Sequence, residues 1–239
     1  MRATMLSSQS RELLKKVSTA TLTTVLFKRG LRNVFIQGIF LLNRAAPRMV
    51  GEAYTLRYIP AREDLDQLGA FEGRGHPQRE AIEACPPGQV LVMDARRDAS
   101  AATGGDILMT RLMVRGAAGI VTDGGLRDTP TIEKLEFPVY CGARSAPLNL
   151  VRHHAIDAQV PIGCGGVAVY PGDVLVGDGE GVVVIPAKFV DEVAQEAASQ
   201  TEFEDWVEVK VKEGRSIFGL YPPDAETKAE FESWKKTRK

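Results

Sequence analysis

Two short motifs in the middle of the chain contain the residues best suited to chemistry. The first, Gly104–Leu108, reads Gly-Gly-Asp-Ile-Leu and is expected to begin a helix. The unpaired N–H groups at a helix start bind anions, and glycine lets a ligand approach the backbone closely. The second motif is Arg127 followed by Asp128, a fixed cation beside a carboxylate. Together the motifs predict a site that holds an acidic substrate against a divalent metal ion.

Each motif also has an ordinary structural explanation. Asp106 could serve only as a helix cap, and an exposed ion pair between Arg127 and Asp128 would contribute little. Two features favour function for the pair. It follows an expected strand, residues 119–123, and a glycine turn, and α/β proteins bind ligands beyond the carboxyl ends of their strands. The surrounding segment is also poor in long charged side chains.

The lysines indicate which catalytic chemistry the chain offers. Between residues 29 and 187 the only lysine is Lys134, with glutamates on both sides. A Schiff-base mechanism needs a desolvated lysine with a lowered pKa, and this polar setting does not provide one. Carbonyl chemistry would therefore need a metal ion to stabilise the negative charge. Asp128 is a hard oxygen ligand, which suits Mg²⁺ or Mn²⁺ completed by water.

The histidines and cysteines predict no further catalytic set. His76 lies in a loop that could line a pocket. His153 and His154 lie in a polar stretch that is expected to be helical and exposed. The cysteines are odd in number and widely spaced, so they are expected to be buried thiols in a reducing compartment.

The composition is that of an ordinary globular protein. The chain has 239 residues, enough for one large domain, and 44% of them are hydrophobic. Its net charge is −1 and it has no long basic run, so no direct binding of nucleic acid is expected. Two lysines follow Leu13 and Leu14 at once, and the longest aliphatic run is only strand-sized. A cytoplasmic location without a leader or membrane span is therefore expected.

Helices and strands are expected to alternate around the two motifs. Periodicity and capping residues predict helices at 7–29 with a break near residue 18, and at 78–84, 106–115, 130–135 and 188–212. Strands are expected at 50–59, 87–94, 120–122 and 138–141, with three more between 159 and 186. Segments 87–94 and 171–178 both begin with Pro-Gly, which is either a common turn sequence or a sign of a repeated structural unit. The pattern predicts one mixed α/β domain without a clear linker.

The motifs resemble those of the RraA-like family. The resemblance rests on these residues: Gly105-Asp106-Ile107-Leu108, Arg111 and Gly116, then Gly119-x-Val121-x-Asp123-Gly124-x-x-Arg127-Asp128. The family contains the 4-hydroxy-4-methyl-2-oxoglutarate/4-carboxy-4-hydroxy-2-oxoadipate aldolases and the regulator of ribonuclease E activity. The resemblance implies an α/β fold, a three-layer β/β/α sandwich like the swivelling phosphohistidine domain, with extra helices at both ends. One domain would span 1–239, with a core at about 17–186 and a helical extension at 187–239, assembled as homotrimers or hexamers.

The resemblance also implies roles for individual residues. Four backbone amides would hold the carboxylate of a 2-oxo acid substrate: those of Gly105, Asp106, Ile107 and Leu108. Arg127 would bind the keto oxygen that becomes an enolate oxygen, and Asp128 would anchor Mg²⁺ or Mn²⁺. Asp106 would help a water molecule to move protons. A neighbouring subunit would add an acid from its C-terminal helix, for which Glu204 and Asp205 are the candidates.

The function implied is that of a divalent-metal-dependent class II aldolase. Such an enzyme cleaves a 4-hydroxy-2-oxo acid into pyruvate and a second carbonyl product, with oxaloacetate decarboxylation as a side activity. Two alternatives remain open: a non-catalytic inhibitor of ribonuclease E, and a lyase or dehydratase for 2-oxo-3-deoxy sugar acids. The chain has extra residues at 27–49, at 61–78 and beyond 221 compared with shorter members. His76, Gln78 and Arg79 could therefore bind the far end of the substrate.

Overall fold

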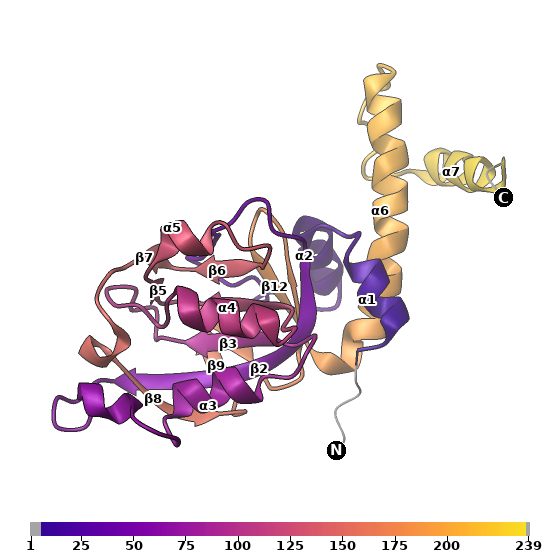
Figure 1. The fold of residues 1–239 in the computed structure, drawn as a ribbon. Helices are drawn as coiled ribbons and strands as arrows, with labels where there is room; N and C mark the ends of the chain where they lie inside the picture. Colours follow the sequence, from indigo (N-terminus) through magenta and orange to yellow (C-terminus); the bar gives the residue numbers. More distant parts are fainter. Residues whose placement is uncertain (1–5, 238–239) are drawn as a thin grey trace.

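The computed structural model describes residues 6–237, and its centre is a curled mixed sheet (Figure 1). The strands follow the order β1-β6-β4-β3-β2-β11-β12, and β8 also pairs with β2. Their bounds are as follows: β1 (Phe40–Leu41), β2 (Met49–Pro60), β3 (Val90–Asp94), β4 (Gly119–Thr122), β6 (Val139–Cys141), β8 (His153–Ala158), β11 (Val174–Gly177) and β12 (Val182–Ile185).

The strands β2, β3, β4 and β6 run parallel and form the centre of the sheet. The residues of β4 and β6 are all buried, which is typical of parallel strands that are covered on both faces. Leu91 of β3 lies opposite Ile120 of β4, so the two strands are in register and end at the same edge. The loops that leave this edge therefore start side by side.

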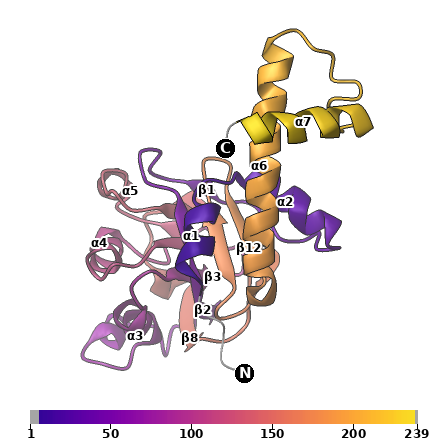
Figure 2. The ribbon, with the colours of Figure 1, turned by 90° about the vertical axis from the view of Figure 1, so that its right-hand side faces the viewer.

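The central strands are covered on both faces, which gives three layers. Helices α3 (Pro77–Ala84), α4 (Asp106–Val114) and α5 (Thr129–Ile132) cover one face of the central strands, and Leu91 and Ile120 pack beneath them. Val92 and Val121 point to the other face, against curled strands that include β9 (Ile162–Cys164) and β10 (Val167–Val169). Figure 2 shows these helices on one side of the strands. The expected α/β sandwich is confirmed.

Further helices pack on the outer face of β11 and β12. They are α1 (Ser8–Leu14), α2 (Thr19–Lys28) and the first half of α6 (Val190–Lys212). Ser7 and Ser18 cap α1 and α2, because each side chain accepts a hydrogen bond from a backbone N–H three residues later. The predicted break between two N-terminal helices is thereby confirmed.

The second half of α6 projects from the body, and α7 (Ala225–Thr237) lies across it (Figures 1 and 2). We call residues 201–237 the C-terminal arm. A hydrophobic cluster separate from the sheet cores holds it together: Phe203, Trp206, Val207, Leu220, Phe231 and Trp234. Across residues 6–237, no helix combines the length and the apolar character needed to cross a membrane.

The structure differs from the sequence-based expectations most clearly in two segments. Residues 153–158 form strand β8 rather than an exposed helix, and His153 is completely buried. The polar composition concealed this strand because only alternate residues of an edge strand face the core, here His153 and Ala155. Between residues 159 and 186 there are also four strands, β9 to β12, where three were expected.

Candidate active site

Backbone hydrogen bonds bring the two predicted motifs together. The loop from β3 to α4 carries Gly104 and Gly105, and the turn after β4 leads through β5 (Gly125–Leu126) to Arg127. The Arg127 N–H donates to the Gly104 carbonyl at 3.1 Å, and the Thr103 N–H donates to the Gly125 carbonyl at 2.8 Å. The helix start and the arginine–aspartate pair are therefore neighbours.

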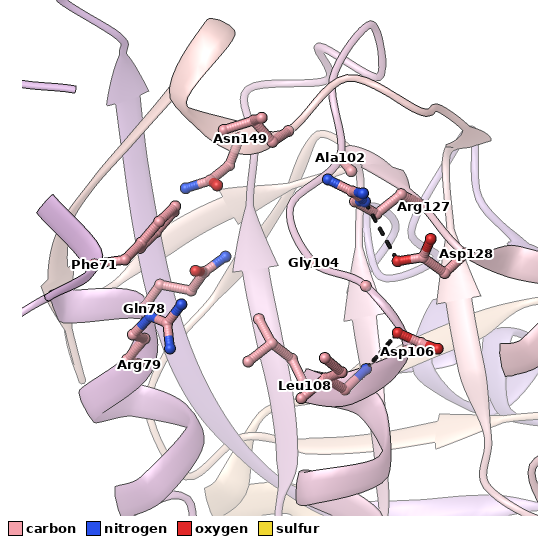
Figure 3. Close-up of a pocket in the computed structure, with 13 residues that line it drawn as sticks. Phe71, Gln78, Arg79, Ala102, Gly104, Asp106, Leu108, Arg127, Asp128 and Asn149 are labelled. Carbon is pink, nitrogen blue, oxygen red and sulfur yellow. Dashed lines mark hydrogen bonds and ion pairs between the residues drawn. The ribbon is translucent and has the colours of Figure 1, made fainter. Parts of the chain in front are cut away.

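The motifs line a cavity of about 370 Å³ at the carboxyl edge of the central strands (Figure 3). Nine residues that the sequence predicted for the site line it: Gln78, Arg79, Gly104, Gly105, Asp106, Ile107, Leu108, Arg127 and Asp128. Four others line it without having been predicted: Phe71, Ala102, Leu148 and Asn149.

Arg127 and Asp128 form an ion pair at one wall of the cavity. The Arg127 Nε and Asp128 Oδ2 atoms are 3.3 Å apart, and both side chains are about 40% exposed, at 43% and 40%. Asp128 has a φ of 56°, which is unusual for a residue other than glycine and marks functional sites more often than others. A Cβ atom on Gly105 would lie 2.6 Å from Asp128 Oδ2, so glycine is the residue that fits there.

The start of α4 leaves fewer N–H groups free than the four amides that were expected to hold the substrate carboxylate. The Leu108 N–H donates to the Gly105 carbonyl at 3.1 Å, and the Ile107 N–H donates to the Asp106 carboxylate at 2.8 Å. Within residues 6–237, the N–H groups of Gly105 and Asp106 have no acceptor. These two amides, helped by the helix dipole, are the ones available to an anionic ligand.

The donor set fits a hard divalent cation. Mg²⁺ is usually bound through one or two carboxylates, with water and substrate oxygens completing its shell. Asp128 offers such a carboxylate beside the cavity, and the part of the chain that the structure describes holds no cluster of three His, Cys, Asp or Glu ligands. Asp128, with water and substrate oxygens completing the shell, therefore fits such an ion.

Residues of the longer 61–78 segment and of α3 form the opposite wall. The Arg79 guanidinium lies 4.8 Å from the centre of the Phe71 ring, and the His76 ring packs against the same phenylalanine. Gln78 Nε2 donates to the Thr103 carbonyl at 2.5 Å, which fixes α3 to the loop that carries Gly104 and Gly105. His76 supports Phe71 rather than lining the cavity, and burial and the nearby Arg79 lower the pKa of its imidazole.

Glu204 and Asp205 lie on α6, away from this chain's own cavity. The Glu204 carboxylate accepts hydrogen bonds from Thr21, Gln200 and Tyr221 at 2.9 to 3.0 Å. Asp205 is exposed. The role expected for them depends on contact between subunits and stays a prediction.

Asp123 positions the loops around the site. Its carboxylate is 4% exposed and accepts backbone N–H bonds from Ala95, Arg97 and Gly165 at 2.6, 3.1 and 2.9 Å. Burial raises the pKa of this carboxyl. Asp123 thus joins the turns that follow β3, β4 and β9, and does not itself line the cavity.

Sequence reasoning missed Asn149 and Phe71. Both come from irregular segments, the turn at Asn149–Val151 and the turn at Leu68–Phe71. Neither segment has a periodic pattern or a motif. The signal that could have indicated Phe71 is its closeness in sequence to the predicted His76, Gln78 and Arg79.

The fold and the cavity define a class of protein: a mixed α/β sandwich with two free amides at a helix start beside an arginine–aspartate pair. The sequence pattern of the RraA-like family, described as Aldolase/RraA, matches residues 19–184. This match covers more than half of the chain, from the start of α2 into β12. The chain therefore belongs to the RraA-like family.

Individual relatives agree with this assignment. The "Putative 4-hydroxy-4-methyl-2-oxoglutarate aldolase" of Halalkalibacterium halodurans is 39% identical over 119 residues, which is 49% of this chain and 56% of that protein. The alignment thus spans little more than half the length of this curated relative. Streptomyces coelicolor RraAS2, described as an unusual member of the RNase ES inhibitor RraA protein family, is 29% identical in its crystal structure. That likeness has a TM-score of 0.76 and covers 86% of this chain and 98% of the other.

A protein of Pseudomonas syringae pv. tomato, described as uncharacterized, has the same fold. Its crystal structure aligns with a TM-score of 0.80 and covers 92% of this chain and 96% of the other. The identity is 24%, so this likeness supports the fold alone.

Proposed function

We propose that this protein is a divalent-metal-dependent carbon–carbon lyase that cleaves a 4-hydroxy-2-oxo acid into pyruvate and a second carbonyl compound. The observation that carries the proposal is the convergence of two free helix-start amides, Arg127 and Asp128 on one small cavity. This is the set of groups that a pyruvate enolate requires. The names of relatives as aldolases support the same reaction class.

The residues of the cavity divide the work of binding. The N–H groups of Gly105 and Asp106 hold the carboxylate of the 2-oxo acid at the start of α4. The Arg127 guanidinium donates to the keto oxygen at C2, where negative charge develops. Charge stabilisation of this kind is often the largest catalytic effect, and losing one donor costs about 10²–10³ in rate. A divalent cation held by Asp128 would act there as a Lewis acid on the same oxygen.

Asp106 supplies the carboxylate for the proton transfer in this mechanism. A water molecule held by its carboxylate takes the proton of the C4 hydroxyl as the C3–C4 bond breaks, leaving a C4 carbonyl. The electrons of that bond form the pyruvate enolate, whose oxygen Arg127 stabilises. Protonation at C3 then releases pyruvate. Decarboxylation of oxaloacetate forms the same enolate, so we expect it as a side activity.

A coupled assay with lactate dehydrogenase tests the proposal across a panel of 4-hydroxy-2-oxo acids and oxaloacetate. We expect pyruvate from at least one substrate with Mg²⁺ or Mn²⁺, loss of activity with EDTA, and recovery when the metal is restored. Arg127→Ala should lower the rate by about 10²–10³ because the enolate loses its donor. Arg32→Ala is the matched control, since Arg32 lies over Phe27 and outside the cavity. Pyruvate release that resists both EDTA and Arg127→Ala would refute the mechanism.

The similarity to RraAS2 favours a second candidate, a non-catalytic regulator that binds ribonuclease E. We rank it second because the cavity retains both acids and the arginine. Capture of an endoribonuclease, with no pyruvate from the whole panel, would reverse this order. The polar wall formed by Gln78, Arg79 and Asn149 also favours testing 2-oxo-3-deoxy sugar acids in the same assay.

A further inference from the structure

Asn149 stands out among the residues of the cavity wall that faces Arg127 and the start of α4. Its side chain is 6% exposed, and its amide nitrogen is buried without a hydrogen-bond partner among residues 6–237. Figure 3 shows the amide directed from the 3₁₀ turn toward the space between Phe71 and Gln78, across the cavity from Arg127. The χ2 torsion of asparagine is soft, so a small rotation presents the amide hydrogens to a ligand.

The backbone that carries Asn149 is hydrogen-bonded to the loops that carry the two motifs, Gly104–Leu108 and Arg127–Asp128. The Ala102 N–H donates to the Pro147 carbonyl at 2.8 Å. The Ser145 N–H donates to the Leu126 carbonyl at 2.9 Å, and the Ser145 hydroxyl donates to the Ser100 carbonyl at 2.8 Å. Asn149 therefore keeps its place relative to both motifs.

Two other buried amides in the described chain show how a structural side chain is satisfied. Gln78 Nε2 donates to the Thr103 carbonyl and to the Tyr58 hydroxyl. Asn43 Nδ2 donates to the Leu135 carbonyl at 2.8 Å, and its Oδ1 accepts from the Val139 N–H at 3.3 Å. Folding disfavours a buried donor without an acceptor. Eight side-chain atoms in the described chain are buried without a partner, and Asn149 Nδ2 is the one whose residue lines this cavity.

We propose that Asn149 is a specificity-determining residue that donates a hydrogen bond to an acceptor at the far end of the substrate. This inference rests on the proposed function, in which Gly105, Asp106 and Arg127 hold the 2-oxo acid end. Arg79 lies on the same wall as Asn149, so an acceptor with negative charge is favoured. The distance between the two walls of the cavity then selects substrates by their length.

Calorimetric binding in the presence of Mg²⁺ tests this inference without requiring turnover. The probes are 2-oxoglutarate and 2-oxopentanoate, which share five carbons and a 2-oxo acid end but carry a carboxylate or a methyl group at the far end. We expect the wild type to bind 2-oxoglutarate more tightly. Asn149→Leu should weaken 2-oxoglutarate binding about tenfold or more, because a hydrogen bond to a charged acceptor is lost, and should change 2-oxopentanoate binding little. Asn149→Asp keeps the shape, adds negative charge and should weaken 2-oxoglutarate binding further.

The controls separate this inference from the proposed reaction. Asn33→Leu makes the same change at an exposed residue outside the cavity and should preserve the preference. Thermal unfolding of each variant checks that the fold is intact. A preference for 2-oxoglutarate that survives in Asn149→Leu, or is absent from the wild type, would overturn the role of Asn149. Absence of pyruvate from the assay panel would instead refute the reaction while leaving the binding preference measurable.

Discussion

Asp123 and Asp128 lie five residues apart in the chain and have opposite surroundings. Asp123 is buried and satisfies three backbone N–H groups, which fixes the loops around the cavity. Asp128 is 40% exposed and lies at the cavity wall beside Arg127. The buried carboxylate therefore builds the site, and the exposed one is available to a ligand.

At the residue scale, the burial of His153 leads to a prediction of how the free energy of unfolding depends on pH. Its Nδ1 atom accepts from Arg96 at 3.2 Å and its Nε2 lies 3.3 Å from the Ala101 carbonyl, an arrangement that fits the neutral ring. Burial lowers the pKa of this imidazole, with Arg96 and Arg152 adding to the effect and Asp98 opposing it. Below about pH 6.5 the unfolded chain gains a proton that the folded chain does not, so the free energy of unfolding should fall.

Denaturant titrations at pH 7.5, 6.5 and 5.5 measure this effect. Each unit by which folding lowers the pKa corresponds to about 1.4 kcal/mol lost once the pH is below both values. His153→Gln should be less stable at pH 7.5 but show a flatter dependence on pH. An equal slope in the variant would show that other groups, such as His76, cause the loss.

Residue types and spacing predicted the helix start at Gly104–Leu108 and the arginine–aspartate pair because their chemistry is local. They could not predict Asn149, whose importance comes from being buried without a partner. Nor could they predict that His153 is buried, since burial depends on a strand pairing with β2, about a hundred residues away. The partners of a polar side chain are a property of the fold.

At the scale of elements, the start of α4 must pack closely against the Arg127–Asp128 turn. Gly105→Ala would place a Cβ atom 2.6 Å from Asp128 Oδ2 and 3.1 Å from Arg127 Cγ. Both side chains are partly exposed and can move, so the free energy of unfolding should change by less than about 1 kcal/mol. The displaced groups should lower pyruvate formation about tenfold or more, because catalysis depends on their placement.

Gly179→Ala is the matched control for this substitution. A Cβ atom there has no neighbour within 4 Å, and the residue lies outside the cavity. Rates and thermal unfolding of the two variants separate a change of geometry from a change of stability. Full activity in Gly105→Ala would show that the two motifs tolerate a wider spacing.

The elements themselves were largely predictable. Continuous aliphatic runs and capping residues identified β3, β4 and α4, because those signals lie within a few residues of one another. β8 escaped because alternate burial at a sheet edge leaves polar residues such as Asp157 in the pattern. The three-layer order was predicted from the family resemblance. Local sequence does not determine strand pairing, such as that of β2 with both β3 and β11.

At the scale of the whole molecule, the C-terminal arm has a core of its own. Phe231 is 8% exposed and contacts both Phe203 and Trp206 with its ring. Phe231→Ala should cost the arm about 3–5 kcal/mol, as expected for removing a buried ring. Hydrogen exchange should then become faster in α7 and the second half of α6, and stay unchanged in β3 and β4.

Phe218→Ala makes the same chemical change on the same arm and should have no such effect, because Phe218 is 90% exposed. Faster exchange throughout the central strands of the Phe231 variant would instead mean that arm and body unfold as one unit. In that case the chain would behave as the single domain expected for residues 1–239. Faster exchange confined to the arm would instead mark the arm as a separate unit.

The backbone bonds that join residues 101–104, 125–127 and 145–147 also bear on how tightly the cavity can bind. These loops already form a ladder beyond the ends of the strands, so a small acid that enters does not have to order them. The conformational entropy is lost once, during folding, and not again at each binding event. Desolvation and charge, rather than loop closure, should therefore set the affinity of this cavity.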